Sequence, residues 1–309
     1  MTNEQYCKNL TPPEGKIDVI IDSDAFTEID DLYAICYAVL KTEKFNIRGI
    51  CAAPFSKPPI AESPEDGMLK SYQEILRLLT LLKREDLKAV TFKGSAAYME
   101  DEKTPVASDA ADFICATAND YSPENPLYIV AIGAITNVAS AMLLEPKMRE
   151  NCVIIWLGGH DAHFPMGASE FNMKQDIAAA RVVMGSGVPF VQLPCRGVVD
   201  RFLTSKQELA YWLQGKNALC DYLYENTVAE AESYAAGKPW TRVIWDVTAV
   251  AWLLNDGERF MRCRLERCPR PMYDKTYAPE PYAHDIGYVY YVDRDALFED
   301  LFRKLGGTV

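Results

Sequence analysis

Long hydrophobic runs and an excess of positive charge are both missing from this sequence. No stretch approaches the roughly 20 apolar residues that cross a bilayer, and residues 1–16 are polar and contain Pro12-Pro13, unlike a secretory signal peptide. The 32 lysines and arginines are outnumbered by 44 aspartates and glutamates, which gives a net charge of −12. Nonspecific binding to nucleic acid or to an anionic membrane needs a cationic surface, so we expect neither as a partner.

Closely spaced cysteine pairs are missing as well. The nine cysteines are scattered, and only Cys263 and Cys268 lie near each other. Without a Cys-x-x-Cys pair, a cysteine zinc site is disfavoured. An odd number of cysteines, most of them within apolar runs, is typical of buried thiols in a reducing compartment. We therefore expect a cytoplasmic protein.

The composition that remains is that of an ordinary globular protein, with 49% hydrophobic and 25% charged residues. Apolar runs alternate with amphipathic stretches, which predicts parallel strands joined by helical crossovers. The predicted strands are residues 17–21, 45–53, 87–92, 126–132, 152–157 and 188–193, followed after a mainly helical region by an edge hairpin at 259–267 and 286–292. We expect one α/β domain over residues 1–309, with an open, mostly parallel β-sheet flanked by helices and a helical C-terminal region around the site.

The first predicted strand runs directly into an acidic segment. Its carboxylates are Asp22, Asp24, Glu28, Asp30 and Asp31, and a helix follows them. Ligands of open α/β sheets bind at the carboxyl ends of strands. Two carboxylates about 4 Å apart repel by about 4 kcal/mol at an effective dielectric near 20. The group must therefore protonate, separate or share a cation, and Ca²⁺ accepts several such oxygens. The alternative is that Asp30 or Asp31 caps the helix while the others are solvated.

Polar residues also follow later predicted strands or open a helix. These segments are Thr136-Asn137, His160 with His163, Glu170-Phe171-Asn172 and Trp245-Asp246. A Pro-rich segment, residues 54–67, is longer than the usual connection, and this length is typical of a binding loop. Asp246 could cap its helix, or it could turn inward and meet Asp24 and Asp31 as a remote metal ligand.

The order of these motifs resembles that of the calcium-dependent nucleoside hydrolases, the inosine–uridine-preferring type. The family's opening Asp-x-Asp-Pro-Gly-x-Asp-Asp is similar to the segment from Asp22 to Asp31, and its Gly-Pro-Leu-Thr-Asn is similar to Gly133–Asn137. Its Glu-Phe-Asn stands intact at Glu170–Asn172. Its late His-Asp resembles Trp245-Asp246, which precedes an Ala-Val-Ala helix segment. The matches run in order from residue 17 to about 254.

The resemblance implies Ca²⁺-dependent hydrolysis of the N-ribosidic bond of a ribonucleoside or a related ribosylated compound. It implies that Ca²⁺ is bound by Asp24, Asp31, Asp246 and the backbone carbonyl of Thr136. Asp24 would also take the proton from the metal-bound water that attacks the sugar. The ribose would be hydrogen-bonded by Asp30, Glu170, Asn172 and Asp246. A homo-oligomer, either a dimer or a tetramer, is implied as well.

Three departures from the family pattern stand out. The first loop has two extra residues between Asp24 and Asp30 and lacks Pro-Gly, and no asparagine follows the second predicted strand. Trp245 stands where a histidine often protonates the departing base, and an indole N–H only donates a hydrogen bond. Trp245 could stack on the base or belong to the core. The general acid is left open among His160, His163, His284 and Tyr282.

Two other functions compete with nucleoside hydrolysis. A haloacid-dehalogenase-type phosphatase would use Asp22 and Asp24 as nucleophile and acid, but such sites want threonine or valine where this chain has Phe26. A ribose- or nucleoside-binding protein that kept the metal site and lost turnover agrees with the missing histidine and asparagine. Release of a free base would distinguish the enzyme from the binding protein. The identity of the base is left open by the sequence.

Overall fold

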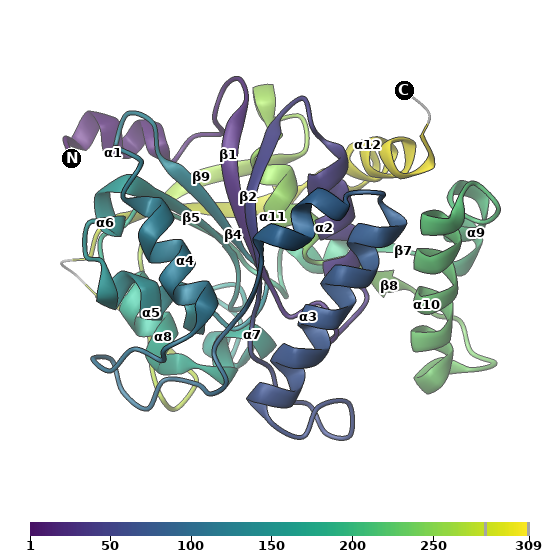
Figure 1. Ribbon diagram of the computed structural model, residues 1–309, viewed down its shortest axis with the longest axis horizontal. Helices are drawn as coiled ribbons and strands as arrows, with labels where there is room; N and C mark the ends of the chain where they lie inside the picture. The colour runs from purple at the N-terminus through teal and green to yellow at the C-terminus, as the bar shows by residue number, and fades with distance from the viewer. Residues whose placement is uncertain (281–282, 308–309) are drawn as a thin grey trace.

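An eight-stranded β-sheet forms the centre of the protein, seen in a computed structural model that describes residues 1–280 and 283–307 (Figure 1). Its strands are β1 (Ile17–Ser23), β2 (Phe45–Ala52), β3 (Thr91–Lys93), β4 (Leu127–Ala131), β5 (Cys152–Leu157), β6 (Phe190–Leu193), β9 (Met261–Arg267) and β12 (Asp285–Val292). They follow the order β3-β2-β1-β4-β5-β6-β12-β9. Every neighbouring pair is parallel except β12 and β9.

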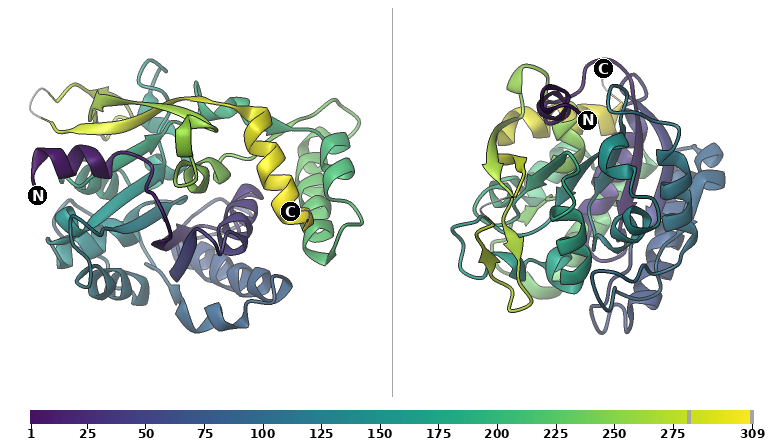
Figure 2. Two further views of the ribbon diagram at one scale, coloured as in Figure 1. Left: turned by 90° about the horizontal axis from the view of Figure 1, so that it is seen from above. Right: turned by 90° about the vertical axis from the view of Figure 1, so that its left-hand side faces the viewer.

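Helices cover both faces of the sheet and form two hydrophobic layers (Figures 1 and 2). One layer contains α2 (Asp30–Leu40), α3 (Pro64–Leu81), α9 (Lys206–Trp212), α10 (Ala218–Ala235), α11 (Val247–Trp252) and α12 (Arg294–Gly306). The other contains α4 (Asp109–Ala118), α5 (Thr136–Leu144), α6 (Met148–Asn151), α7 (Phe171–Gln175) and α8 (Ile177–Met184). Among the described residues, no helix combines the length and the apolar character needed to cross a membrane.

Shorter elements complete the chain. The first helix, α1 (Asn3–Asn9), lies beside the end of the sheet that carries β12 (Figure 2), where the Tyr6 hydroxyl donates to the Asp285 carbonyl at 2.8 Å. Two small antiparallel pairs are β7 (Leu203–Thr204) with β8 (Arg242–Val243) and β10 (Arg270–Pro271) with β11 (Tyr277–Ala278). The 3₁₀ turns are η1 (Glu85–Val90), η2 (Gly167–Ser169), η3 (Val199–Arg201) and η4 (Asp256–Glu258).

The strand order reverses between β1 and β4, and this is the feature that positions the site. β1 pairs with β2 on one side and with β4 on the other. The connections from these two strands leave in opposite directions, so a crevice opens beyond their carboxyl ends, where ligands of such sheets bind. The residues directly after β1 and β4 therefore face this crevice.

The predicted fold class, an open and mostly parallel sheet flanked by helices, is confirmed. Two local predictions need correction, and a third is extended. A 3₁₀ turn, η1, occupies most of the predicted strand at 87–92, because Lys88 interrupts the short apolar run and only Thr91–Lys93 pairs with β2. Ser63 caps α3 with Pro64 in the first turn, so the helix begins inside the predicted loop. β9 and β12 do pair as predicted, but β12 also joins β6 and extends the main sheet.

Candidate active site

A cleft of about 410 Å³ opens beyond the carboxyl ends of β1, β4 and β5. Most of the site residues predicted from the sequence line it, namely Asp24, Asp30, Asp31, Glu170, Asn172, Trp245 and Asp246. They come from the β1–α2 loop, the start of α2, the start of α7 and the residues before α11. Thr136 does not line the cleft. The sequence motifs thus converge on one place.

The last two side chains of β1, those of Asp22 and Ser23, point to opposite faces of the sheet. Ile20 and Asp22 point to the face covered by α5, where the Asn137 amide donates to Asp22 Oδ1 at 2.8 Å. Ser23 points to the other face, and its hydroxyl donates to Asp31 Oδ1 at 2.6 Å. Asp22 therefore faces away from the cleft, while the next carboxylate, Asp24, lies at the strand end and lines it.

Three buried carboxylates form a cluster at the base of the cleft. Asp30, Asp31 and Asp246 each offer an oxygen, and these oxygens lie within 4.8 Å of one another. Asp24 lines the same cleft, with its Oδ2 accepting a hydrogen bond from the Thr27 hydroxyl at 2.7 Å. The family resemblance predicts Asp24, rather than Asp30, as a metal ligand beside Asp31 and Asp246. The structure brings all four carboxylates into one cleft and gathers Asp30 most closely with Asp31 and Asp246.

Burial and mutual repulsion dominate the electrostatics of these carboxylates. Burial, reinforced by the charge of Asp30, raises the pKa of Asp24 to about 8. Burial likewise raises the pKa of Asp30 to about 7, against the opposing effect of Arg242. The pKa values of Asp31 and Asp246 are raised well above the usual range by burial and by their acidic neighbours. A hard divalent cation would relieve this repulsion, and the all-oxygen donor set fits Ca²⁺.

The metal-free protein is expected to lose stability as the pH rises from about 5 to about 8.5. A carboxyl group with a raised folded pKa stabilises the folded state below its unfolded pKa of about 4, and this contribution is lost as the pH rises through the folded value. The folded pKa values are about 8 for Asp24 and about 7 for Asp30, so their contributions to stability are lost as the pH rises through these values. Thermal unfolding in a chelator should therefore show Tm falling across the range.

Added calcium provides the internal control for this pH prediction. Metal ligands must be deprotonated, so Ca²⁺ should raise Tm more at pH 8 than at pH 5.5. Magnesium at the same concentration tests for a general effect of divalent salt. A Tm in chelator that stays flat or rises with pH would contradict the raised pKa values of the cluster.

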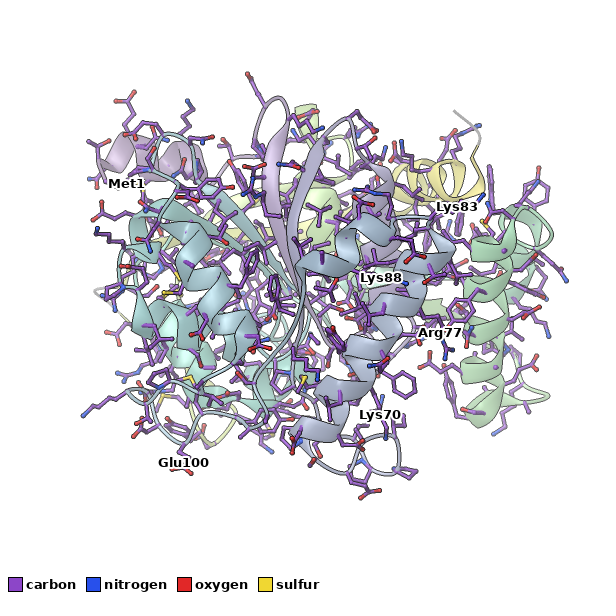
Figure 3. The ribbon with its side chains drawn as sticks, in the orientation of Figure 1. Met1, Lys70, Arg77, Lys83, Lys88 and Glu100 are labelled. Carbon is purple, nitrogen blue, oxygen red and sulfur yellow. The ribbon has the colours of Figure 1, made fainter. Side chains whose placement is uncertain are left out.

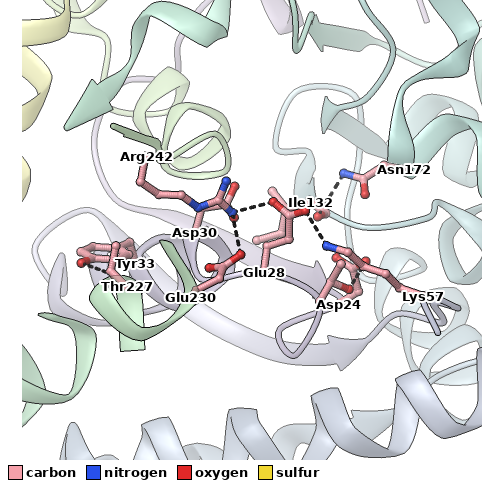
Figure 4. A network of polar contacts seen from close by, with 11 residues as sticks. Asp24, Glu28, Asp30, Tyr33, Lys57, Ile132, Asn172, Thr227, Glu230 and Arg242 are labelled. Atoms are coloured by element: carbon pink, nitrogen blue, oxygen red, sulfur yellow. Dashed lines mark hydrogen bonds and ion pairs between the residues drawn. The ribbon is translucent and has the colours of Figure 1, made fainter. Parts of the chain in front are cut away.

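Thr136 occupies a structural position that differs from the predicted one. It is buried at the start of α5, and its hydroxyl donates to Asp176 Oδ2 at 2.7 Å. Ile132, directly after β4, lines the cleft instead, and its carbonyl accepts from Asn172 Nδ2 at 3.2 Å (Figure 4). The residue at the cleft wall is therefore Ile132, which directly precedes the Gly133–Asn137 motif, because the chain leaves the site as soon as α5 begins.

The Glu170–Asn172 segment is held by its own hydrogen bonds. The Glu170 carboxylate accepts from the backbone N–H groups of Gly159, Asn172 and Met173 at 2.8 to 3.0 Å, so it caps α7 while lining the cleft. The Asn172 amide donates to the carbonyls of Ile132 and Leu157. Both amide hydrogens of Asn172 are thereby used, which leaves its Oδ1 as the acceptor available to a ligand.

A buried network of charges, which the sequence did not reveal, surrounds the lengthened first loop (Figure 4). The Arg242 guanidinium lies 2.6 Å from Glu28, 3.3 Å from Glu230 and 3.6 Å from Asp30. Lys57 donates to Glu28 at 2.7 Å. Burial opposes ionisation of Glu28, but the charges of Arg242 and Lys57 outweigh it and lower the pKa of that carboxyl. The lengthened loop therefore adds an acidic side chain whose charge is balanced by two cations.

The candidate general acids separate clearly in the structure. His160 lines the cleft, whereas His163 is exposed outside it and His284 lies in another cavity. Tyr282 lies outside the described residues. Burial and the nearby charge of Arg196 lower the pKa of His160 to about 4. The His160 Nδ1 accepts a hydrogen bond from the backbone N–H of Arg196 at 3.3 Å. His160 is therefore neutral at pH 7 and presents Nε2–H as a hydrogen-bond donor.

Comparisons with known proteins agree with this arrangement. A family described as inosine-uridine preferring nucleoside hydrolase matches residues 19–297. A pyrimidine-specific ribonucleoside hydrolase of Salmonella schwarzengrund is 27% identical over 202 residues, which cover 57% of this chain and 59% of that protein. The chain thus spans less than two thirds of the length of the curated relatives that it matches first.

Solved structures share the fold over nearly the whole chain. A plant nucleoside hydrolase aligns with a TM-score of 0.73 at 19% identity, covering 94% of this chain and 99% of that one. An inosine-uridine preferring nucleoside hydrolase from Bacillus anthracis aligns with a TM-score of 0.70 at 14% identity, covering 95% of this chain and 100% of that one. At these identities the likeness shows the fold alone.

Proposed function

Since the chain belongs to the inosine-uridine preferring nucleoside hydrolase family, we propose that it hydrolyses the N-ribosidic bond of a ribonucleoside or a related ribosylated compound. The observation that carries the proposal is the buried cluster of Asp30, Asp31 and Asp246, which opens into a cleft also lined by Asp24. Cleavage of this bond passes through a ribosyl centre with positive charge. Preorganised carboxylates in a water-poor cleft stabilise such charge as it develops.

We assign Ca²⁺ as the cofactor of this reaction. Asp31 and Asp246 would hold it, with Asp24 or Asp30 and the Ile132 carbonyl as further oxygen ligands. When bound, the ion would fix the attacking water and lower its pKa. The closeness of buried carboxylates that lack enough cationic partners supports this assignment, because such a group is stable only when it is protonated or shares a cation.

We assign proton removal from water to Asp24 and ribose binding to Asp30, Glu170, Asn172 and Asp246. Thr27 fixes Asp24 Oδ2, which leaves Oδ1 as the proton acceptor. Burial and the charge of Asp30 raise the pKa of Asp24 in the metal-free cluster, and a cation held by the neighbouring carboxylates would lower it again, so that the ionised carboxylate could accept a proton. The Oδ1 of Asn172 would accept a hydrogen bond from a ribose hydroxyl. We also propose that the protein is cytoplasmic, consists of a single domain and forms dimers or tetramers.

The direct test is base release from a panel of purine and pyrimidine ribonucleosides, with the metal content of the purified protein measured in parallel. Free base and ribose in equal amounts, lost in chelator and restored by Ca²⁺, would support the proposal. The competing function is a binding protein without turnover, favoured by the absence of a cationic histidine at the site. Calcium-dependent nucleoside binding without base release would establish that alternative.

Trp245 provides a prediction about substrate recognition. Its indole lines the cleft next to Asp246 and is only partly buried, as expected of a surface on which a base can stack. Stacking of a base on an aromatic side chain is worth about 1–3 kcal/mol. Trp245→Ala should therefore raise KM by about ten- to a hundredfold with little change in kcat. Trp245→Phe, which retains a stacking face, is the matched control, and a KM unaltered by alanine would refute the role.

A further inference from the structure

A tyrosine from late in the chain packs behind the part of the cleft wall that carries Glu170. Tyr277 lies on β11 of the small β10–β11 pair and does not itself line the cleft. The carbonyl of Lys275, in the turn of this pair, accepts from the Ala168 N–H at 3.1 Å and so ties the pair to η2. Any contribution of Tyr277 to the site must therefore pass through the residues that it contacts.

Tyr277 lies against two glycines of the segment that leads to Glu170. A Cβ atom on Gly159 would lie 1.9 Å from the Tyr277 hydroxyl oxygen, and a Cβ atom on Gly167 would lie 2.5 Å from the ring. Gly159 also has a φ of +79°, in the region that favours glycine. The His160 N–H donates to the Gly167 carbonyl at 2.7 Å, so both glycines belong to one hydrogen-bonded turn. Tyr277 fits there because neither glycine has a side chain.

The Tyr277 hydroxyl touches both residues whose N–H groups hold one oxygen of Glu170. Glu170 Oε2 accepts from the Gly159 N–H at 3.0 Å and from the Met173 N–H at 2.9 Å. The hydroxyl lies against the Gly159 backbone and donates to Met173 Sδ at 3.4 Å. Burial raises the pKa of Tyr277 above its ordinary value, so the hydroxyl keeps the proton that it donates. A single hydroxyl group therefore fixes the spacing of two donors to the carboxylate.

Gln192 provides a second connection between Tyr277 and the same turn. This buried side chain on β6 donates its amide hydrogens to the Gly158 carbonyl at 2.9 Å and to the Tyr277 hydroxyl at 3.2 Å. Both hydrogens of the amide are thereby used. Without the hydroxyl, one of them would be buried and unpaired, which is unfavourable. Tyr277 thus holds the turn directly at Gly159 and indirectly at Gly158.

We propose that Tyr277 is a positioning residue for ribose binding, which acts by fixing the Glu170 carboxylate through Gly159 and Met173. This inference rests on the proposed function, in which Glu170 binds the ribose. A carboxylate held by backbone N–H groups is already oriented when the sugar arrives, so binding costs little ordering. If two of these donors are loosened, the carboxylate can adopt other orientations, and the loss should appear in substrate affinity.

The first test is a double-mutant cycle of Tyr277→Phe with Glu170→Gln, measured by base release at saturating Ca²⁺. Tyr277→Phe removes only the hydroxyl and should raise KM about three- to tenfold, with kcat changed less than about twofold. In the Glu170→Gln background the same substitution should change KM less than about twofold, because both residues act on one contact. Effects on KM that multiply in the double variant would overturn the proposal.

Tyr222→Phe is the matched control. The Tyr222 hydroxyl also accepts from one side chain and donates to another, namely Arg77 and Glu74. These residues join α10 to α3 and do not line the cleft, and Figure 3 labels Arg77 on α3. Tyr222→Phe should therefore leave KM within about twofold of wild type. An equal rise of KM in both variants would show a general effect of a lost tyrosine hydroxyl and refute the positioning role.

Hydrogen exchange measured by mass spectrometry decides the inference without turnover. In Tyr277→Phe the peptides that cover residues 158–174 should exchange about three- to tenfold faster, whereas Tyr222→Phe should not alter them. If wild type releases no base, the proposed hydrolysis fails, and ribose binding by calorimetry replaces KM in the same cycle. Unchanged exchange of these peptides in Tyr277→Phe would overturn the positioning role, whatever the outcome for hydrolysis.

Discussion

The Asp24→Asn variant is expected to lose about 10²–10⁴-fold in kcat/KM for base release. The substitution keeps the size of the side chain, but a carboxamide cannot take a proton from water at neutral pH. It also removes one negative charge from the crowded cleft, so the affinity for Ca²⁺ should fall as well. Initial rates by chromatography, together with metal content by mass spectrometry, measure the two effects separately. A rate within about tenfold of wild type would exclude Asp24 as the base.

The neighbouring Asp22→Asn variant is the matched control. Asp22 belongs to the same strand and is fully buried, but it faces α5 and contacts Asn137 rather than the cleft. Its Oδ2 is buried without a hydrogen-bond partner among the described residues, so an isosteric amide adds no clash with an existing partner. Base release and bound calcium should stay close to wild type. Loss of both in this variant would show that the strand end, rather than the Asp24 carboxylate, is what the activity requires.

The Arg242→Met variant is expected to lower the free energy of unfolding by about 3–5 kcal/mol. The Arg242 side chain is 11% exposed and faces Glu28, Asp30 and Glu230 together. Methionine keeps the unbranched apolar stem and removes the charge, so the buried Asp30 and the partly buried Glu28 and Glu230 lose their shared partner. Urea unfolding in the presence of calcium measures the change, which should appear as a lower midpoint at constant slope.

Arg264→Met supplies the comparison for this stability effect. Arg264 pairs with Glu266 at 2.6 Å, but its side chain is 50% exposed on β9. Exposed pairs of this kind contribute about 0–1 kcal/mol, so its loss should hardly change the unfolding midpoint. If Arg242→Met changed the unfolding midpoint as little as Arg264→Met, the three carboxylates would have to be solvated or protonated without Arg242. That result would contradict the stabilising role assigned to Arg242.

The strands and most of the site could be predicted because their signals are local. A β-branched run such as Ile17–Ile21 fits only a buried strand, and the loop that follows it must lie at the carboxyl edge of the sheet. Ser108 caps α4, and serine is one of the residue types that favour this position. The resemblance to a family then predicted that Asp246 meets Asp24 and Asp31, and in the structure the Asp246 carboxylate gathers most closely with Asp30 and Asp31.

The residues that were missed act through the backbone or over long distances. Ile132 contributes its backbone carbonyl, which every residue type has, so the amino-acid type at this position does not predict the role. The motif pointed to Thr136 instead. Arg242 is separated from Glu28 by most of the chain, and nothing near either residue predicts their contact.

The position of β12 in the sheet has a consequence for synthesis on the ribosome. Strands β1 to β6 emerge in an order that lets each find a partner already made, but β6 pairs next with β12, whose first residue is Asp285. Until that segment leaves the exit tunnel, β6 presents an open parallel edge that can pair with a strand of another nascent chain. Asp246 also emerges late, so its cluster with Asp30 and Asp31 cannot form in the early part of the chain alone. Protection of newly made protein from aggregation therefore depends on the last strand to be translated.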